Sequence, residues 1–272
     1  MKAKRILVLL LCLVMVLAIA GCGGKSESKE ITVFAAASMT EAMTEIKAQY
    51  EAANKGVTIT YNFDSSGTLK TQIQEGAVCD VFISAAQKQM NQLDASCDSE
   101  KNPDGLDFVL QGSRIDLLEN KVALVVPEGN PKGINSFDDL AAALKAGTVF
   151  MAMGNEDVPV GQYTQKILAF YDLSEEELAN AGLITYGSNV KEVTTQVKEA
   201  SVDCGVVYCT DATSAGLTII DTASAEMCGQ VIYPAAVMKN SADTAAAQAF
   251  LDYVATGAGK DVLIKYGFSP LA

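Results

Sequence analysis

The sequence predicts an α/β protein of two lobes, in which each lobe is a mostly parallel sheet flanked by helices and a ligand cleft lies between them. Three observations support this prediction. Short apolar segments alternate with helical patterns, which is typical of parallel βαβ units. Long apolar strands can connect two sets of such units. Two strands end in serine where a helix begins, and open α/β sheets bind ligands at these carboxyl ends.

The first 30 residues indicate export and lipidation. Three basic residues precede an apolar run at 6–20 that ends in the letters IAGC, a pattern typical of a secretory signal peptide. The ending resembles a bacterial lipobox, in which Cys22 becomes the lipidated first residue. We therefore expect a lipoprotein signal peptide at 1–21 and a polar tether at 22–30. A retained membrane anchor is the alternative, but the run is shorter than the ~20 residues that span a bilayer.

Composition argues against several functions. The chain has 20 basic and 33 acidic residues and a net charge of −13; the signal peptide holds three of the basic residues and no acidic one, so the mature charge is −16. Such an acidic chain lacks the basic footprint of a nucleic-acid-binding protein. The absence of histidine excludes Ser-His-Asp triads, Cys-His pairs and His-ligated zinc. No glycine-rich phosphate motif follows a strand either, so we predict that the protein is not an enzyme.

Five cysteines remain after the signal peptide and Cys22 are set aside. Five is an odd number, so at least one thiol stays free or pairs between molecules, and the sequence leaves the connectivity open. There is no CxxC motif, and no metal site is expected. Cys79 and Cys204 lie at strand edges and are expected to be small buried hydrophobes. The five are Cys79, Cys97, Cys204, Cys209 and Cys228.

In the first part of the chain, Ser38 and Ser66 each follow a strand and open a helix. The first N–H groups of a helix have no intrahelical partner, and the helix dipole makes this end positive. A serine adds a hydroxyl donor, so two such ends facing one cleft would form a site for a small anion. The alternative is that both serines only cap their helices. Strands are expected at 31–38, 57–63 and 79–85, and helices at 39–53 and 64–76.

The remaining elements repeat the alternation after a polar stretch at 94–112, which is expected to be a long loop. The chain should leave the first lobe near residue 121 and return near residue 234. We therefore assign 31–120 and 235–272 to lobe 1 and 121–234 to lobe 2. Strands are expected at 121–126, 148–153, 184–186, 205–208, 216–221 and 231–238, and helices from 135, at 162–171, at 174–183, from 188 and at 244–255.

Five strand-to-helix turns should converge on the cleft between these lobes. None of the five residues at these turns is charged, so a bound anion would be held by dipoles and hydroxyls rather than by lysines. From residue chemistry alone, a tyrosine in such a turn would be a core residue, and the two valines would not be selected. The five residues are Ser38, Ser66, Val160, Val190 and Tyr208.

Six segments occur in one order over almost the whole mature chain: FAAASMTEAM, SSGTLKTQIQEGA, CDVFISA, VPVGQY, GVVYCTDA and FLDYVATGAGKDVLIKYGF. Together they resemble the molybdate-binding proteins of ABC transporters, a branch of the type II periplasmic binding proteins. The resemblance implies the two-lobed fold of that family and a tetrahedral oxyanion as ligand. It implies that the side chains of Ser38, Ser66 and Tyr208 donate to the anion and that Val160 and Val190 contribute main-chain amides.

The resemblance also implies partners and a location. Molybdate, and tungstate with it, would be delivered to an ABC transporter permease and its ATPase, with no cofactor and no metal beyond the oxyanion itself. The protein would be a monomer, attached through lipidated Cys22 to the extracytoplasmic face of the cell membrane. A sulfate receptor is one alternative, because sulfate has the same charge and shape. An enzyme or an adhesin on a lipoprotein anchor is the other.

Three positions depart from the family pattern. The family often has alanine at Val160, glycine at Cys209 and aspartate at Ala86. A branched side chain at Val160 could narrow the pocket. Cys209 would matter if the glycine that it replaces had a positive φ. Ala86 affects only a local hydrogen bond.

Overall fold

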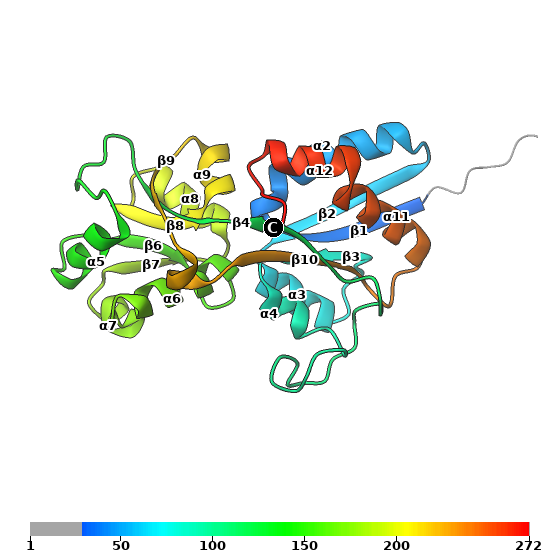
Figure 1. The fold of residues 1–272 in the computed structure, drawn as a ribbon, viewed down its shortest axis with the longest axis horizontal. Helices are drawn as coiled ribbons and strands as arrows, with labels where there is room; N and C mark the ends of the chain where they lie inside the picture. Colours follow the sequence, from blue (N-terminus) through cyan, green and yellow to red (C-terminus); the bar gives the residue numbers. More distant parts are fainter. Residues whose placement is uncertain (1–28, 272) are drawn as a thin grey trace, which may run out of the picture.

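The computed structural model describes residues 29–271 and contains two lobes (Figure 1). Each lobe is built on one five-stranded sheet with helices on both faces, which confirms the predicted two-lobed α/β fold. The predicted signal peptide at 1–21 and Cys22 lie outside the described residues. The predicted tether at 22–30 is too long at its end, because Lys29 and Glu30 already pair with β2 as the first residues of β1. Within residues 29–271, no helix is both long and apolar enough to cross a membrane.

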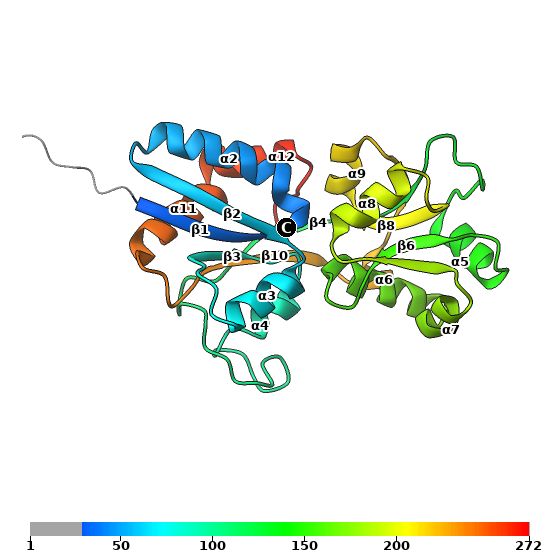
Figure 2. The same cartoon turned by 180° about the vertical axis from the view of Figure 1, so that it is seen from behind.

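The first sheet has the order β2-β1-β3-β10-β4. Figures 1 and 2 show α2, α11 and α12 over one face and α3 and α4 over the other. The strands are β1 (Lys29–Ala36), β2 (Val57–Asp64), β3 (Val81–Ile83), β4 (Ile115–Asn120) and β10 (Val231–Val237), and the helical elements are η1 (Ala37–Met39), α2 (Thr40–Ala53), α3 (Ser66–Gln74), α4 (Gln87–Asn91), α11 (Thr244–Ala255) and α12 (Gly257–Lys265).

The second sheet has the order β7-β6-β8-β5-β9. Helices α8 and α9 lie over one face, and α6 and α7 lie over the other (Figure 2). The strands are β5 (Val122–Val126), β6 (Met151–Gly154), β7 (Ile184–Gly187), β8 (Cys204–Tyr208) and β9 (Thr218–Thr222), and the helices are α5 (Phe137–Lys145), α6 (Pro159–Phe170), α7 (Glu175–Asn180), α8 (Val190–Lys198), α9 (Cys209–Ala215) and α10 (Ala225–Cys228).

The sheets are more mixed than the mostly parallel sheets that the sequence suggested. In each sheet two strand pairs are parallel and two are antiparallel. The antiparallel pairs are those of β10 in the first sheet and of β5 in the second. Both strands enter their sheet directly from the other lobe, so no helical crossover sets their direction, and antiparallel pairing needs none.

The chain passes between the lobes at two short links. Only Lys121 separates β4 from β5. The return, expected near 234, comes earlier, because Val231 already pairs with Asn120 in the first sheet. Pro234 marks no boundary. It sits inside β10 at a shift in the β4–β10 register, a position where a strand tolerates the missing N–H.

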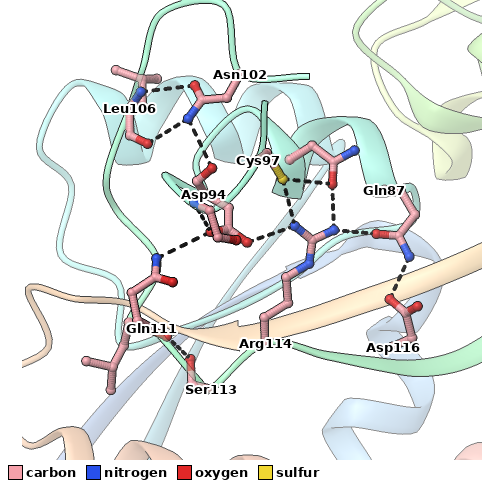
Figure 3. Close-up of polar contacts among 12 residues, drawn as sticks. Gln87, Asp94, Cys97, Asn102, Leu106, Gln111, Ser113, Arg114 and Asp116 are labelled. Carbon is pink, nitrogen blue, oxygen red and sulfur yellow. Dashed lines mark hydrogen bonds and ion pairs between the residues drawn. The ribbon is translucent and has the colours of Figure 1, made fainter. Parts of the chain in front are cut away.

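Strand β4 was not predicted, because its sequence IDLLEN lies at the edge of the sheet, buries only Leu118 and Asn120, and has no continuous apolar run. The polar stretch before it forms the expected long loop, held by a network around Arg114 (Figure 3). The guanidinium of Arg114 pairs with Asp94 at 2.9 Å and also donates to Gln87 and Asn91.

All five described cysteines are free thiols. Cys79 and Cys204 are buried, which confirms the prediction that they act as small hydrophobes. Burial also raises the pKa of both thiols, so they stay protonated near neutral pH.

Candidate anion-binding site

A small cavity of about 10 Å³ lies between the two lobes and is lined by all five residues that the sequence singled out. Pockets for drug-sized ligands occupy roughly 300–1,000 Å³, so this cavity has room only for a very small solute. The first lobe and the second lobe both contribute to the wall. The lining residues are Ala36, Ala37, Ser38, Asp64, Ser65, Ser66, Ala85, Val158, Pro159, Val160, Val190 and Tyr208.

Two buried serines form the wall on the first lobe, and neither of them caps a helix. Ser65, not Ser66, is the N-cap of α3, since its hydroxyl accepts from the Thr68 N–H at 3.1 Å. The Ser66 hydroxyl instead accepts from the Ala85 N–H at 2.9 Å, so its own hydrogen remains available to donate. Ser38 lies in η1, before α2, and makes no capping hydrogen bond to that helix.

A chain of hydrogen bonds positions the Ser38 hydroxyl. The Asn120 amide nitrogen lies 3.2 Å from the Tyr233 hydroxyl and 2.9 Å from the Thr210 hydroxyl. An amide NH₂ can only donate, so both hydroxyl oxygens accept from it. The Tyr233 and Ser38 hydroxyls lie 2.9 Å apart, and either of them can donate to the other.

Sequence reasoning missed Asn120, Thr210 and Tyr233. Tyr233 lies in an apolar strand and is fully buried, so its sequence context is that of a core tyrosine. Asn120 is the last residue of β4, next to the crossing between the lobes. The one signal available in the sequence was an asparagine directly before the expected crossing between the lobes, where its amide could take part in the site.

Residues in the first turns of two helices line the cavity on the second lobe. Val160 follows Pro159 in the first turn of α6, and Val190 is the first residue of α8. N–H groups at these positions have no intrahelical acceptor. The Asn189 side chain caps α8 by accepting from Lys191 and Glu192, which leaves the Val190 N–H unused by the cap.

Tyr208, at the end of β8, completes the cavity. Its ring packs edge-on against Tyr163 and Tyr233, with centroids 6.4 and 5.8 Å away. Within residues 29–271 its buried hydroxyl makes no well-aligned hydrogen bond. Burial, with a smaller contribution from Tyr233, raises its pKa well above the usual value, so the hydroxyl stays protonated. A buried donor of this kind favours a ligand that carries acceptor atoms.

One charged residue, Asp64, lies on the cavity wall, and the lining residues include no lysine or arginine. Asp64 is half-buried, and its Oδ1 accepts from the Ser65 N–H at 2.7 Å. The sequence analysis did not identify it, because it precedes the serine pair instead of occupying the expected ligand position. A ligand in the cavity therefore meets many donors and one carboxylate.

The lobes touch directly beside the cavity. The Gly67 N–H, in the first turn of α3, donates to the Asp157 carbonyl of the second lobe at 3.1 Å. A Cβ on Gly67 would lie 2.2 Å from that carbonyl oxygen, so glycine is required for this approach. The structure is therefore that of a closed cleft.

The three departures from the family pattern cause no strain. Cys209 opens α9 and is not among the described residues with positive φ, so glycine is not required there. Ala86 is the N-cap residue of α4, and its side chain makes no capping hydrogen bond. Alanine in place of aspartate therefore affects only a local hydrogen bond. Val160 is fully buried and packs within the core cluster.

This arrangement defines a class of protein: two lobes that meet around a small cavity bind a solute. Within the described chain, no group of acidic or cysteine side chains could hold a metal ion. The chain belongs to the family of bacterial extracellular solute-binding proteins, whose model matches residues 31–269.

Relatives support this assignment. A molybdate-binding protein ModA from Haemophilus influenzae is 33% identical over 93% of this chain and 95% of its own length. A relative from Bacillus subtilis, provisionally named as an ABC transporter substrate-binding lipoprotein, YvgL, is 32% identical over 98% of both chains. The periplasmic molybdate-binding protein of Azotobacter vinelandii has the same fold, with a TM-score of 0.74, 21% identity and coverage of 89% of this chain and all of that chain. These matches confirm the predicted family and the prediction that the protein is not an enzyme.

Proposed function

We propose that the protein binds molybdate, and tungstate with it, between its lobes and delivers the anion to the permease and ATPase of an ABC transporter. One observation carries the proposal: a closed cavity between the lobes is lined by three buried hydroxyls and by the starts of α6 and α8, without a cation. A fully deprotonated oxyanion has only acceptor atoms, so it suits these donors. The names of the relatives from Haemophilus and Bacillus support both the anion and the transporter.

In this proposal the hydroxyls of Ser38, Ser66 and Tyr208 donate to the anion, and so do the amides of Val160 and Val190. Charge-assisted hydrogen bonds contribute roughly 1.5–3 kcal/mol each. Several of them, less the costs of desolvation and lobe closure, are compatible with tight binding.

A protonated oxyanion such as hydrogenphosphate is the second candidate, and Asp64 is the observation that favours it. Hydrogenphosphate carries an O–H group, and the Asp64 carboxylate on the wall could accept a hydrogen bond from it. A fully ionised anion has no such donor. Sulfate remains a third possibility, because it differs from molybdate in size rather than in charge.

A thermal-shift screen of molybdate, tungstate, sulfate, phosphate and small organic acids separates these candidates. At a hundredfold excess over Kd, binding stabilises the folded state by about 2.7 kcal/mol, which raises Tm by several degrees at this size. Molybdate and tungstate should do so at micromolar concentrations, whereas sulfate and phosphate should not. A phosphate shift lost in Asp64→Asn would favour the second candidate, and no shift with any anion would favour a surface lipoprotein without a transport role.

We also propose that the protein is a monomer attached through lipidated Cys22 to the extracytoplasmic face of the membrane, with residues 22–28, before β1, as tether. The IAGC ending and the lipoprotein name of the Bacillus relative support this attachment. Fractionation of cells that express wild type or Cys22→Ser tests it. The wild type should label with a fatty acid and sediment with membranes, and the variant should do neither.

A further inference from the structure

An ion pair crosses between the lobes next to the cavity. Lys191 Nζ, in the second lobe, lies 2.9 and 2.8 Å from the two carboxylate oxygens of Glu41, in the first lobe. It also lies 3.0 Å from Asp211 Oδ1 within its own lobe. The lysine thus joins a carboxylate of each lobe.

Each member of this triad stands in the first turn of a helix that begins at the cavity. Glu41 follows Ser38 by three residues in α2, and Asp211 follows Tyr208 by three residues in α9. Lys191 directly follows Val190 in α8. None of the three triad residues is among the residues that line the cavity. They stand next to the turns that line the cavity without taking part in its wall.

The two carboxylates differ in burial, and this gives them different roles. Asp211 is fully buried, and within the described residues neither of its oxygens has a well-aligned hydrogen bond, so the charge of Lys191 compensates it. Asp211 therefore holds the ammonium in place whether the cleft is open or closed. Glu41 is 39% exposed and meets Lys191 only when the lobes meet.

We propose that Glu41 and Lys191 are positioning residues, which hold the first turns of α2 and α8 together across the cavity and slow the release of the bound anion. Opening the cleft separates the pair, while Asp211 keeps Lys191 oriented for the next closure. The effect on anion release depends on the proposed function, whereas the role of the pair in holding the lobes together does not.

The test compares Glu41→Gln with a matched control, Glu45→Gln. Glu45 lies one turn further along α2 and pairs with Lys265 of α12 at 2.7 Å, inside the first lobe. The control thus removes a lysine–glutamate pair from the same helix without touching the cleft. Lys191 is left in place, because its loss would strand the buried carboxylate of Asp211.

The first readout is hydrogen exchange of the Gly67 amide in the protein without anion. This N–H has no acceptor within α3 and bonds to Asp157 across the lobes, so its protection reports closure. Exchange should be about two- to fivefold faster in Glu41→Gln than in wild type, the range measured for partly exposed ion pairs. Glu45→Gln should match wild type.

The second readout is the dissociation rate of molybdate by stopped flow. It should rise by the same two- to fivefold in Glu41→Gln, with an unchanged association rate, and the difference should shrink at high salt. Equal behaviour of the two variants in either readout would overturn the proposal. If wild type binds no molybdate, the proposed function fails, and the exchange readout alone still decides whether this pair holds the lobes together.

Discussion

Replacing Tyr208 by phenylalanine should change stability and affinity in opposite directions. The Tyr208 hydroxyl is buried and has no well-aligned hydrogen bond among residues 29–271. A buried donor without a partner costs roughly 1–3 kcal/mol. Phenylalanine keeps the ring contacts with Tyr163 and Tyr233 and removes this cost. The protein without anion should therefore become more stable, by up to about 1–3 kcal/mol, or a few degrees in Tm.

Affinity should fall in the same variant, because a donor to a charged acceptor is lost. The expected loss is roughly 1.5–3 kcal/mol, which is about ten- to more than a hundredfold in the Kd for molybdate. Calorimetric titration measures the affinity, and urea unfolding without anion measures the stability.

Tyr233→Phe is the matched control, since the Tyr233 hydroxyl bonds to both Ser38 and Asn120. This variant should lose stability without anion. The reasoning is refuted if Tyr208→Phe also loses stability, or if its Kd for molybdate equals that of wild type.

Three further predictions follow from the cavity and its surroundings. Replacing both Ser38 and Ser66 with alanine should weaken molybdate binding by several kcal/mol. The affinity of wild type should change little between low and physiological salt, because the contacts are buried. A steep salt dependence in calorimetric titrations would indicate a basic pocket instead. Burial raises the pKa of Asp211 to about 6, so the folded state holds this proton more tightly than the unfolded chain, and the contribution of Asp211 to stability should decline as pH rises from about 4 to 6. The unfolding free energy of wild type minus that of Asp211→Asn should fall over that window in urea titrations, and a constant difference would contradict the shift. Gly67→Ala would place a methyl group 2.2 Å from the Asp157 carbonyl oxygen, so it should hinder closure and weaken binding while far-UV circular dichroism stays unchanged; wild-type affinity in this variant would show that the lobes need not approach so closely.

The sequence predicted the parts of the site that depend on local pattern. Ser38 and Ser66 were found because each follows a strand and precedes a helix, a short-range signal. Val160 and Val190 were found only through the family resemblance, since the contribution proposed for them is the main-chain N–H. A residue that contributes only its main-chain amide can have almost any side chain, so its residue type does not identify it in the sequence.

The residues that were missed act over long separations. Tyr233 and Ser38 are 195 residues apart, and Glu41 and Lys191 are 150 residues apart. The Glu41–Lys191 pair depends on how the two lobes are placed against each other, and the Tyr233–Ser38 pair depends on the strand order of the first sheet. No local pattern encodes either arrangement. Strand β4 was missed for another reason, because this edge strand buries only Leu118 and Asn120 and has no continuous apolar run.

The two short links between the lobes limit how the protein can move. One link is Lys121 alone, between β4 and β5, and the other is the two residues Gly229 and Gln230, between α10 and β10. Two such links form a hinge with one axis of rotation. The lobes can open and close about this axis, but they cannot slide or twist freely against each other. Every closure then returns the five residues that we propose as donors to the same relative positions. In the proposed function, selectivity between anions of different radius therefore depends on the length of the two links, and a longer link at either place should relax selectivity before it weakens binding.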